Sequence, residues 1–97
     1  MAHGKVLVVD DEQLLVKSTC MAMKVYGFET RGAMNADQVF SVLEEFTPDI
    51  IFLDIMMPGV DGWQVLARLK EDGKNADIPV VVFTAKEYSD GKALAQS

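Results

Sequence analysis

The sequence predicts an α/β fold built on a parallel sheet. Three short runs of apolar, mostly β-branched residues alternate with longer stretches whose apolar residues recur at helical spacing; the runs are 6–9, 50–53 and 80–83. Continuous apolar runs of this length are typical of strands buried on both faces of a parallel sheet. Right-handed crossovers between such strands place helices on both sides of the sheet. We therefore expect a single doubly wound domain over residues 1–97.

The first connecting segment predicts a helix followed by a weak strand. Residues 12–26 carry apolar or small side chains at helical spacing, and Gly27 supplies a stop signal. The spaced positions are Leu15, Thr19, Ala22, Met23 and Tyr26. Residues 28–31 then have the composition of a short strand, which gives the sheet a fourth member.

Two further helices are expected. Asn35 can cap the first of them, and Gln38, three residues later, would complete a capping box. This helix has an apolar stripe and ends before Pro48; the stripe is Val39, Leu43 and Phe46. Residues 55–62 are dense in turn formers and predict a loop. A third helix over 63–70 would turn Leu66 and Leu69 inward.

Composition narrows the classes of function. The chain has a formal net charge of −6, which argues against a nucleic-acid surface because such a surface needs clustered Lys and Arg. No apolar run approaches the roughly 20 residues needed to span a membrane. The single cysteine, Cys20, suits a reducing compartment. We expect a cytoplasmic protein that binds cations or basic partners.

Each strong strand ends in an oxygen-bearing side chain. Asp10 and Asp11 follow the first run, Asp54 follows the second and Thr84 the third. The carboxyl ends of parallel strands meet at one edge of a sheet, where ligands bind. Three carboxylates gathered there repel one another unless a cation relieves the repulsion, and Mg²⁺ is the natural candidate. Such a site suits attack of a carboxylate on phosphorus, with a hydroxyl and backbone amides holding the phosphoryl oxygens.

A plainer interpretation exists for each residue alone. Asp10 or Asp11 by itself is more often a helix cap than a metal ligand, and Asp54 by itself is more often a turn residue. The whole set at the ends of apolar runs favours the functional interpretation, because the plain one requires several independent coincidences.

Three motifs carry a resemblance to a known family. Residues 6–12, 48–62 and 78–85 together resemble the receiver domain of bacterial two-component response regulators, including the chemotaxis regulators. The resemblance spans the whole chain, and the combination of motifs is highly specific. It implies a flavodoxin-like sheet with strand order 2-1-3-4-5.

The resemblance also implies roles for individual residues. Asp54 would be phosphorylated by a sensor histidine kinase or a phosphotransfer protein. Asp10, Asp11 and Asp54 would hold Mg²⁺ together with the backbone carbonyl of Met56. Thr84 would supply the hydroxyl that follows the phosphoryl group during switching, and the small Ala85 would leave its amide accessible. Pro58 and Gly62 match the loop after the acceptor, where glycine tolerates unusual backbone angles.

The sequence departs from the family in one respect. The family's lysine lies on a fifth strand, and no counterpart occurs before Ser97. The resemblance therefore implies a C-terminally truncated receiver over residues 1–97, with order 2-1-3-4. Its fourth strand, 80–83, would form an exposed edge through which two copies could pair as a homodimer.

Two other classes of protein share part of this pattern. Phosphatases of the haloacid-dehalogenase kind also attack phosphorus with an aspartate after a strand, but they need a second acid two residues later, where this chain has Met56. A truncated or degenerate receiver that binds partners without phosphorylation remains an alternative, because the lysine is absent. The preferred prediction is a regulatory phosphoacceptor domain and not an enzyme.

Overall fold

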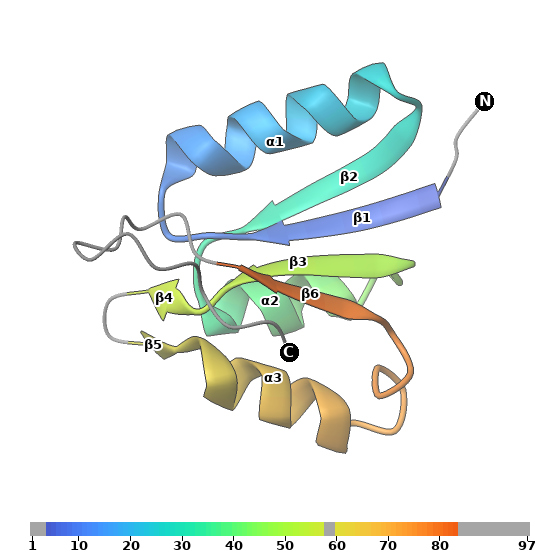
Figure 1. The fold of residues 1–97 in the computed structure, drawn as a ribbon. Coiled ribbons are helices and arrows are strands. Elements are labelled where there is room, and N and C mark those ends of the chain that lie inside the picture. The colour runs from blue at the N-terminus through green and yellow to red at the C-terminus, as the bar shows by residue number, and fades with distance from the viewer. Residues whose placement is uncertain (1–3, 58–59, 84–97) are drawn as a thin grey trace.

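A four-stranded parallel sheet forms the centre of the molecule in the computed structural model, which describes residues 4–57 and 60–83 (Figure 1). The strands lie in the order β2-β1-β3-β6 and all pairs are parallel. Their bounds are β1 Gly4–Val9, β2 Phe28–Ala33, β3 Ile50–Asp54 and β6 Val80–Phe83. The predicted flavodoxin-like order 2-1-3-4 is confirmed.

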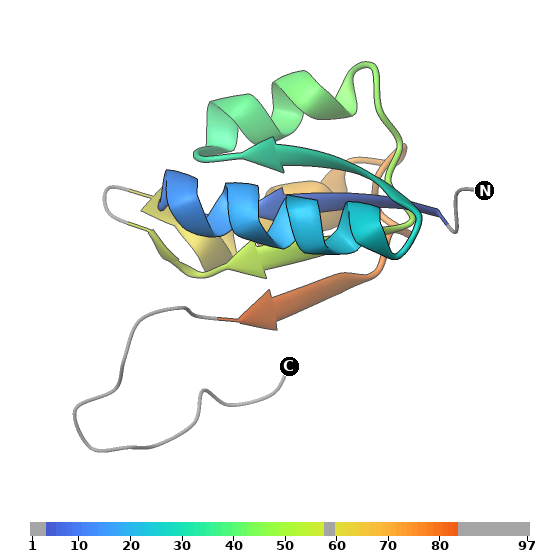
Figure 2. The ribbon, with the colours of Figure 1, turned by 90° about the horizontal axis from the view of Figure 1, so that it is seen from above.

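Helices cover both faces of this sheet. Helix α1 (Gln13–Val25) lies on one face, and α2 (Ala36–Leu43) and α3 (Gly62–Glu71) lie on the other (Figures 1 and 2). The segment predicted as a loop after β3 contains a small antiparallel ladder, in which β4 (Met56–Met57) pairs with β5 (Val60–Asp61). Because this segment is rich in turn-forming residues, its sequence does not predict these two short strands.

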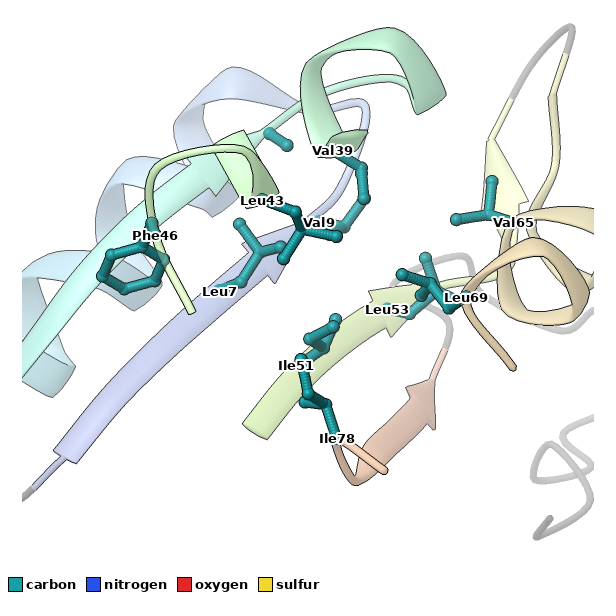
Figure 3. Packing of buried hydrophobic residues seen from close by; sticks show 11 residues of the cluster. Leu7, Val9, Val39, Leu43, Phe46, Ile51, Leu53, Val65, Leu69 and Ile78 are labelled. Atoms are coloured by element: carbon teal, nitrogen blue, oxygen red, sulfur yellow. The ribbon is translucent and has the colours of Figure 1, made fainter. Parts of the chain in front are cut away.

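The main core lies between the sheet and the pair α2 and α3. Side chains alternate between the two faces of a strand, so Leu7 and Val9 of β1 and Ile51 and Leu53 of β3 share one face. All four are completely buried, and they pack with α2, α3 and the loops beside them (Figure 3). The rest of this cluster is Ala33, Val39, Leu43, Phe46, Val65, Leu69 and Ile78.

Two details of α2 and α3 differ from the prediction. The Asn35 side chain accepts a hydrogen bond from the backbone N–H of Gln38, as a cap should, at 2.9 Å. The Gln38 side chain, however, accepts from the N–H of Met34 at 2.8 Å, one residue before the cap. In α3, Leu66 and Leu69 both pack against the core as predicted, and the buried Val65 is an inward residue that the prediction missed.

Of the five positions predicted at helical spacing in α1, two are half-buried and three are exposed. Val16 is the buried residue of this helix, whereas Leu15 is 37% exposed and Tyr26 is 72% exposed. Gly32 of β2 explains this orientation, because a Cβ at residue 32 would lie 2.3 Å from Val16 Cγ1. The glycine lets Val16 approach the sheet, and this contact fixes the rotation of the helix. The predicted stop is confirmed, since Gly27 has a positive φ of 94° just after the helix.

Candidate functional site

Two buried carboxylates meet at the carboxyl edge of the sheet. Asp10 directly follows β1 and Asp54 is the last residue of β3, and Val9 and Leu53 before them are partners in the parallel ladder. Asp10 is 1% exposed and Asp54 is completely buried. The N–H of Asp10 donates to the carbonyl of Ala33 at 3.1 Å, which ties the residue to β2 as well. The predicted convergence of Asp10 and Asp54 is therefore present.

Burial and neighbouring acids change the electrostatics of Asp10. The pKa of its carboxyl group is raised from 3.8 to about 6, mainly because the group is buried, while a hydrogen bond from the backbone N–H of Glu12 (3.0 Å) acts in the opposite direction. The nearby charge of Asp54 and hydrogen bonds with the side chains of Asp11 and Asp54 contribute to the same rise. The arrangement thus disfavours a full set of negative charges.

A third and a fourth carboxylate lie beside this pair. Oxygen atoms of Asp10, Asp11 and Glu12 all lie within 4.8 Å of one another. Asp11 is half-buried, while Glu12 is exposed and occupies the N-cap position of α1 without a capping hydrogen bond from its side chain. Sequence analysis did not select Glu12 as a site residue. Its position directly after Asp10 and Asp11 was the available signal, but an exposed polar residue is ordinary at the start of a helix.

The composition of this cluster fits a hard divalent cation. The side chains in the cluster offer only carboxylate oxygens, and Mg²⁺ prefers oxygen ligands while retaining several waters. The raised pKa of Asp10 comes first from burial and then from the neighbouring acids, and a bound cation would offset both. The side chains of this cluster are therefore ligands of the kind that Mg²⁺ prefers.

The loop after Asp54 is held close to the start of α3. Ile55 donates its N–H to the carbonyl of Phe83 at 3.0 Å, which extends the ladder to β6. A Cβ on Gly62 would lie 2.3 Å from the Cα of Ile55. Gly62 does not have a positive φ, so the predicted reason for this glycine was wrong. It is needed because the backbone of α3 comes so near to the residue after Asp54.

The remaining predicted site residues are placed only in part. Met56 begins β4, two residues after Asp54. Thr84, Ala85 and Pro58 lie outside the described residues. Phe83, the last residue of β6, is the ladder partner of Asp54.

Comparison with known proteins identifies the family. Residues 6–96 match the family described as the response regulator receiver domain. The match covers nearly the whole chain, and the chain therefore belongs to this family. Receiver domains are regulatory domains of two-component signalling, and the predicted resemblance is confirmed.

Individual relatives agree with this assignment. The chain is 38% identical over 92 residues to the phosphate regulon transcriptional regulatory protein PhoB of Pseudomonas aeruginosa, covering 95% of this chain and 40% of that protein. It is 38% identical over 82 residues to the response regulator PleD of Caulobacter vibrioides, covering 84% of this chain and 18% of that protein. The chain thus spans less than half the length of these relatives.

Solved structures show the same fold. The N-terminal domain of a response regulator receiver protein from Methanoculleus marisnigri superposes with a TM-score of 0.82 at 33% identity, covering 93% of this chain and 74% of that one. The chemotaxis response regulator CheY4 of Vibrio cholerae gives a TM-score of 0.77 at 22% identity, covering 95% and 75%, which supports the fold alone. Among the described residues, no helix is both long and apolar enough to cross a membrane.

Proposed function

We propose that this receiver domain is a phosphorylation switch whose acceptor is Asp54. The observation that carries the proposal is the burial of Asp54 at the end of β3, in contact with Asp10 and next to the cluster of Asp11 and Glu12. A buried carboxylate at the edge where a parallel sheet binds ligands is suited to nucleophilic attack, because the site orients it and limits water.

The donor would be a phosphohistidine of a sensor kinase or a phosphotransfer protein. An Asp54 carboxylate oxygen bonds to phosphorus while the bond between phosphorus and the donor's imidazole nitrogen breaks, and that nitrogen keeps the electron pair. Asp10, Asp11 and the Met56 carbonyl would hold Mg²⁺ beside Asp54. When bound, the ion supplies positive charge against the phosphoryl oxygens. The Thr84 hydroxyl and the Ala85 amide would then bind those oxygens.

Acetyl phosphate tests the acceptor. With Mg²⁺ present, the intact mass of the protein should rise by one phosphoryl group. Asp54→Asn should abolish this gain, whereas Asp77→Asn, which removes an exposed carboxylate outside the cluster, should leave it unchanged. Labelling that survives Asp54→Asn would reject this acceptor. Failure of the unaltered protein to label would favour the alternative, a module that binds partners without phosphorylation.

Metal binding has a separate readout. Trp63 is the single tryptophan and lies at the start of α3, beside the loop that follows Asp54. Its fluorescence should change as Mg²⁺ is added, with modest affinity because Mg²⁺ keeps most of its waters. Asp11→Asn should weaken the titration and Asp77→Asn should not. An unchanged affinity in Asp11→Asn would place the ion elsewhere.

An exposed apolar stripe on α1 supports docking of a helical phosphodonor. Leu14, Met21 and Val25 are 76%, 67% and 83% exposed, and their spacing places them on one side of α1. This helix starts directly after the acid cluster of residues 10–12. Met21→Lys should slow transfer from purified phosphorylated kinases but not labelling by acetyl phosphate. Ser41→Lys, which adds the same charge to an exposed position on α2, is the control. Equal slowing by both variants would contradict docking on α1.

The other expectations have no direct test in the structure. A cytoplasmic location stays a prediction, and so does the lack of nucleic-acid contacts by this chain. The names of the relatives describe transcriptional and response regulators. By analogy with these regulators, we infer that phosphorylation of this domain controls an output.

A further inference from the structure

Glu12 is the member of the acid cluster that meets solvent most fully. Two hydrogen bonds fix its backbone, since its N–H donates to Oδ1 of Asp10 at 3.0 Å and its carbonyl accepts from the N–H of Val16 at 3.0 Å. One carboxylate oxygen from each of Asp10, Asp11 and Glu12 lies within 4.8 Å of the other two. Asp10 is buried, Asp11 is half-buried and Glu12 is exposed. The backbone thus holds the Glu12 charge on the solvent side of the site.

The N-cap position does not account for the carboxylate of Glu12. Residues at this position usually accept a hydrogen bond from the first turn of the helix, and short side chains such as Ser, Thr, Asp and Asn do so best. The Glu12 side chain makes no such bond to α1, a helix that the structure describes in full. Glu12→Gln keeps the size of the side chain and removes only its charge. This substitution should therefore leave the helix intact.

A carboxylate in this position acts on a cation and on an anion in opposite directions. Mg²⁺ binds one or two carboxylates directly and keeps several waters, so a further exposed carboxylate can accept hydrogen bonds from those waters. The same negative charge repels an anionic phosphodonor that approaches Asp54. Because exposed charges are screened by solvent and salt, each effect should be about two- to threefold.

We propose that Glu12 is a positioning residue of the phosphorylation site, which holds Mg²⁺ through the ion's waters and selects against phosphodonors of high negative charge. This role rests on the proposed phosphorylation of Asp54. Among small donors, phosphoramidate carries a protonated nitrogen at neutral pH and has a smaller net negative charge than acetyl phosphate. Glu12 therefore favours donors with a phosphorus–nitrogen bond, the class to which phosphohistidine belongs.

Titration of the whole protein with Mg²⁺ tests the effect on the cation without any phosphorylation. The affinity, followed by NMR shifts of the backbone amides of residues 10–13, should fall about two- to threefold in Glu12→Gln. Glu45→Gln removes an exposed carboxylate from the connection between α2 and β3 and should leave it unchanged. The loss should shrink at high salt. Equal affinities of the two variants would overturn the proposal, whereas an unchanged affinity in Asp11→Asn as well would reject the metal site itself.

The rates of labelling by two donors test the selectivity at saturating Mg²⁺. Labelling by acetyl phosphate should be about two- to threefold faster in Glu12→Gln than in the unaltered protein, and labelling by phosphoramidate should change less. Glu12→Asp keeps the charge and should retain the ratio of the two rates. An unchanged ratio in Glu12→Gln would overturn the proposal, and so would equal changes in both rates with a loss of stability in urea, which would indicate a structural role. No labelling of the unaltered protein by either donor would reject Asp54 as the acceptor, and the Mg²⁺ titration would then decide the role of Glu12.

Discussion

The two faces of the sheet differ in how completely they are covered. On β3, Ile51 and Leu53 point toward α2 and α3 and are completely buried, while Ile50 and Phe52 point toward α1 and are only half-buried. Figure 2 shows the reason, since α1 does not extend over β6. Val81 of β6, on the α1 face, is 41% exposed. The α2–α3 face therefore supplies most of the hydrophobic stabilisation.

An apolar run in the sequence therefore does not indicate how deeply each of its residues is buried. The four residues 50–53 are Ile, Ile, Phe and Leu, which look equivalent in the sequence. Their environments are decided by which helix lies opposite and how far it reaches. Matched substitutions on the two faces test this asymmetry.

The largest effect should come from the covered face. Ile51→Ala should lower the free energy of unfolding by about 3 to 4 kcal/mol, because a buried Ile leaves a cavity when truncated. Ile50→Ala, the same change in its half-buried neighbour, should cost about half as much. Urea denaturation of both variants measures the difference. If Ile51→Ala fails to fold, the pair Ile51→Val and Ile50→Val replaces it. Equal costs on the two faces would contradict the asymmetry.

A second comparison concerns glycines under each helix layer. A Cβ at Gly62 would meet the backbone of Ile55 at 2.3 Å, and one at Gly32 would meet the side chain of Val16 at the same distance. A side chain on the loosely covered α1 face can move, whereas backbone next to Asp54 cannot. Gly62→Ala should therefore cost about 2 to 3 kcal/mol and Gly32→Ala about 1 kcal/mol. Thermal or urea unfolding checks both.

Two further variants serve as controls for Gly62→Ala and Gly32→Ala. Gly73→Ala should be nearly neutral, because a Cβ there meets no atom within 4 Å. Adding Val16→Ala to Gly32→Ala should recover part of the loss by removing the clash. If Gly32→Ala proved more harmful than Gly62→Ala, the α1 face would be the more rigid of the two.

The strands and the acid pair could be predicted from sequence because each signal is local. An apolar run ended by Asp10 or Asp54 defines both a strand and its carboxyl end, and parallel pairing then brings these ends together. The rotation of α1 could not be predicted in this way. Leu14, Leu15 and Val16 are all apolar, and the close approach of Val16 to Gly32, which the local sequence does not show, distinguishes Val16 from the other two.

Several details of the site depend on the three-dimensional structure and not on the local sequence. The pKa of Asp10 depends on burial and on Asp54, which lies 44 positions later in the sequence. The place of Glu12 in the cluster depends on the turn between β1 and α1. The need for glycine at residue 62 arises from a contact between backbones, which its sequence context does not reveal.

The buried carboxyl group of Asp10 should make the free energy of unfolding depend on pH in the absence of divalent cations. The folded-state pKa of Asp10, about 6, lies above the ordinary value of 3.8, so the folded protein holds this proton more tightly than the unfolded chain. The resulting stabilisation is complete below about pH 4 and is lost as the pH rises through 6. Its size is about 1 to 3 kcal/mol. Urea midpoints measured between pH 4 and 7 report it.

Asp10→Asn isolates this contribution. The variant should gain stability relative to the unaltered protein as the pH rises from 4 to 7, because it carries no charge to be buried. Asp77→Asn, at an exposed position, should follow the unaltered protein at every pH. A constant difference between Asp10→Asn and the unaltered protein across this range would show that Asp10 titrates normally.

The smallest effect on stability, and a large one on association, is expected at the edge of the sheet. In the described residues β6 pairs on one side only, with β3, and it exposes Val81. An apolar edge is a template for pairing with a second copy, so the homodimer stays a prediction for this strand. Val81→Lys should change the free energy of unfolding by less than about 0.5 kcal/mol. It should also shift sedimentation toward the monomer, because a buried lysine opposes strand pairing. Val25→Lys makes the same substitution at an exposed site on α1 and should leave the association unchanged. A monomeric protein at all concentrations, or a dimer that only Val25→Lys dissociates, would contradict pairing through β6.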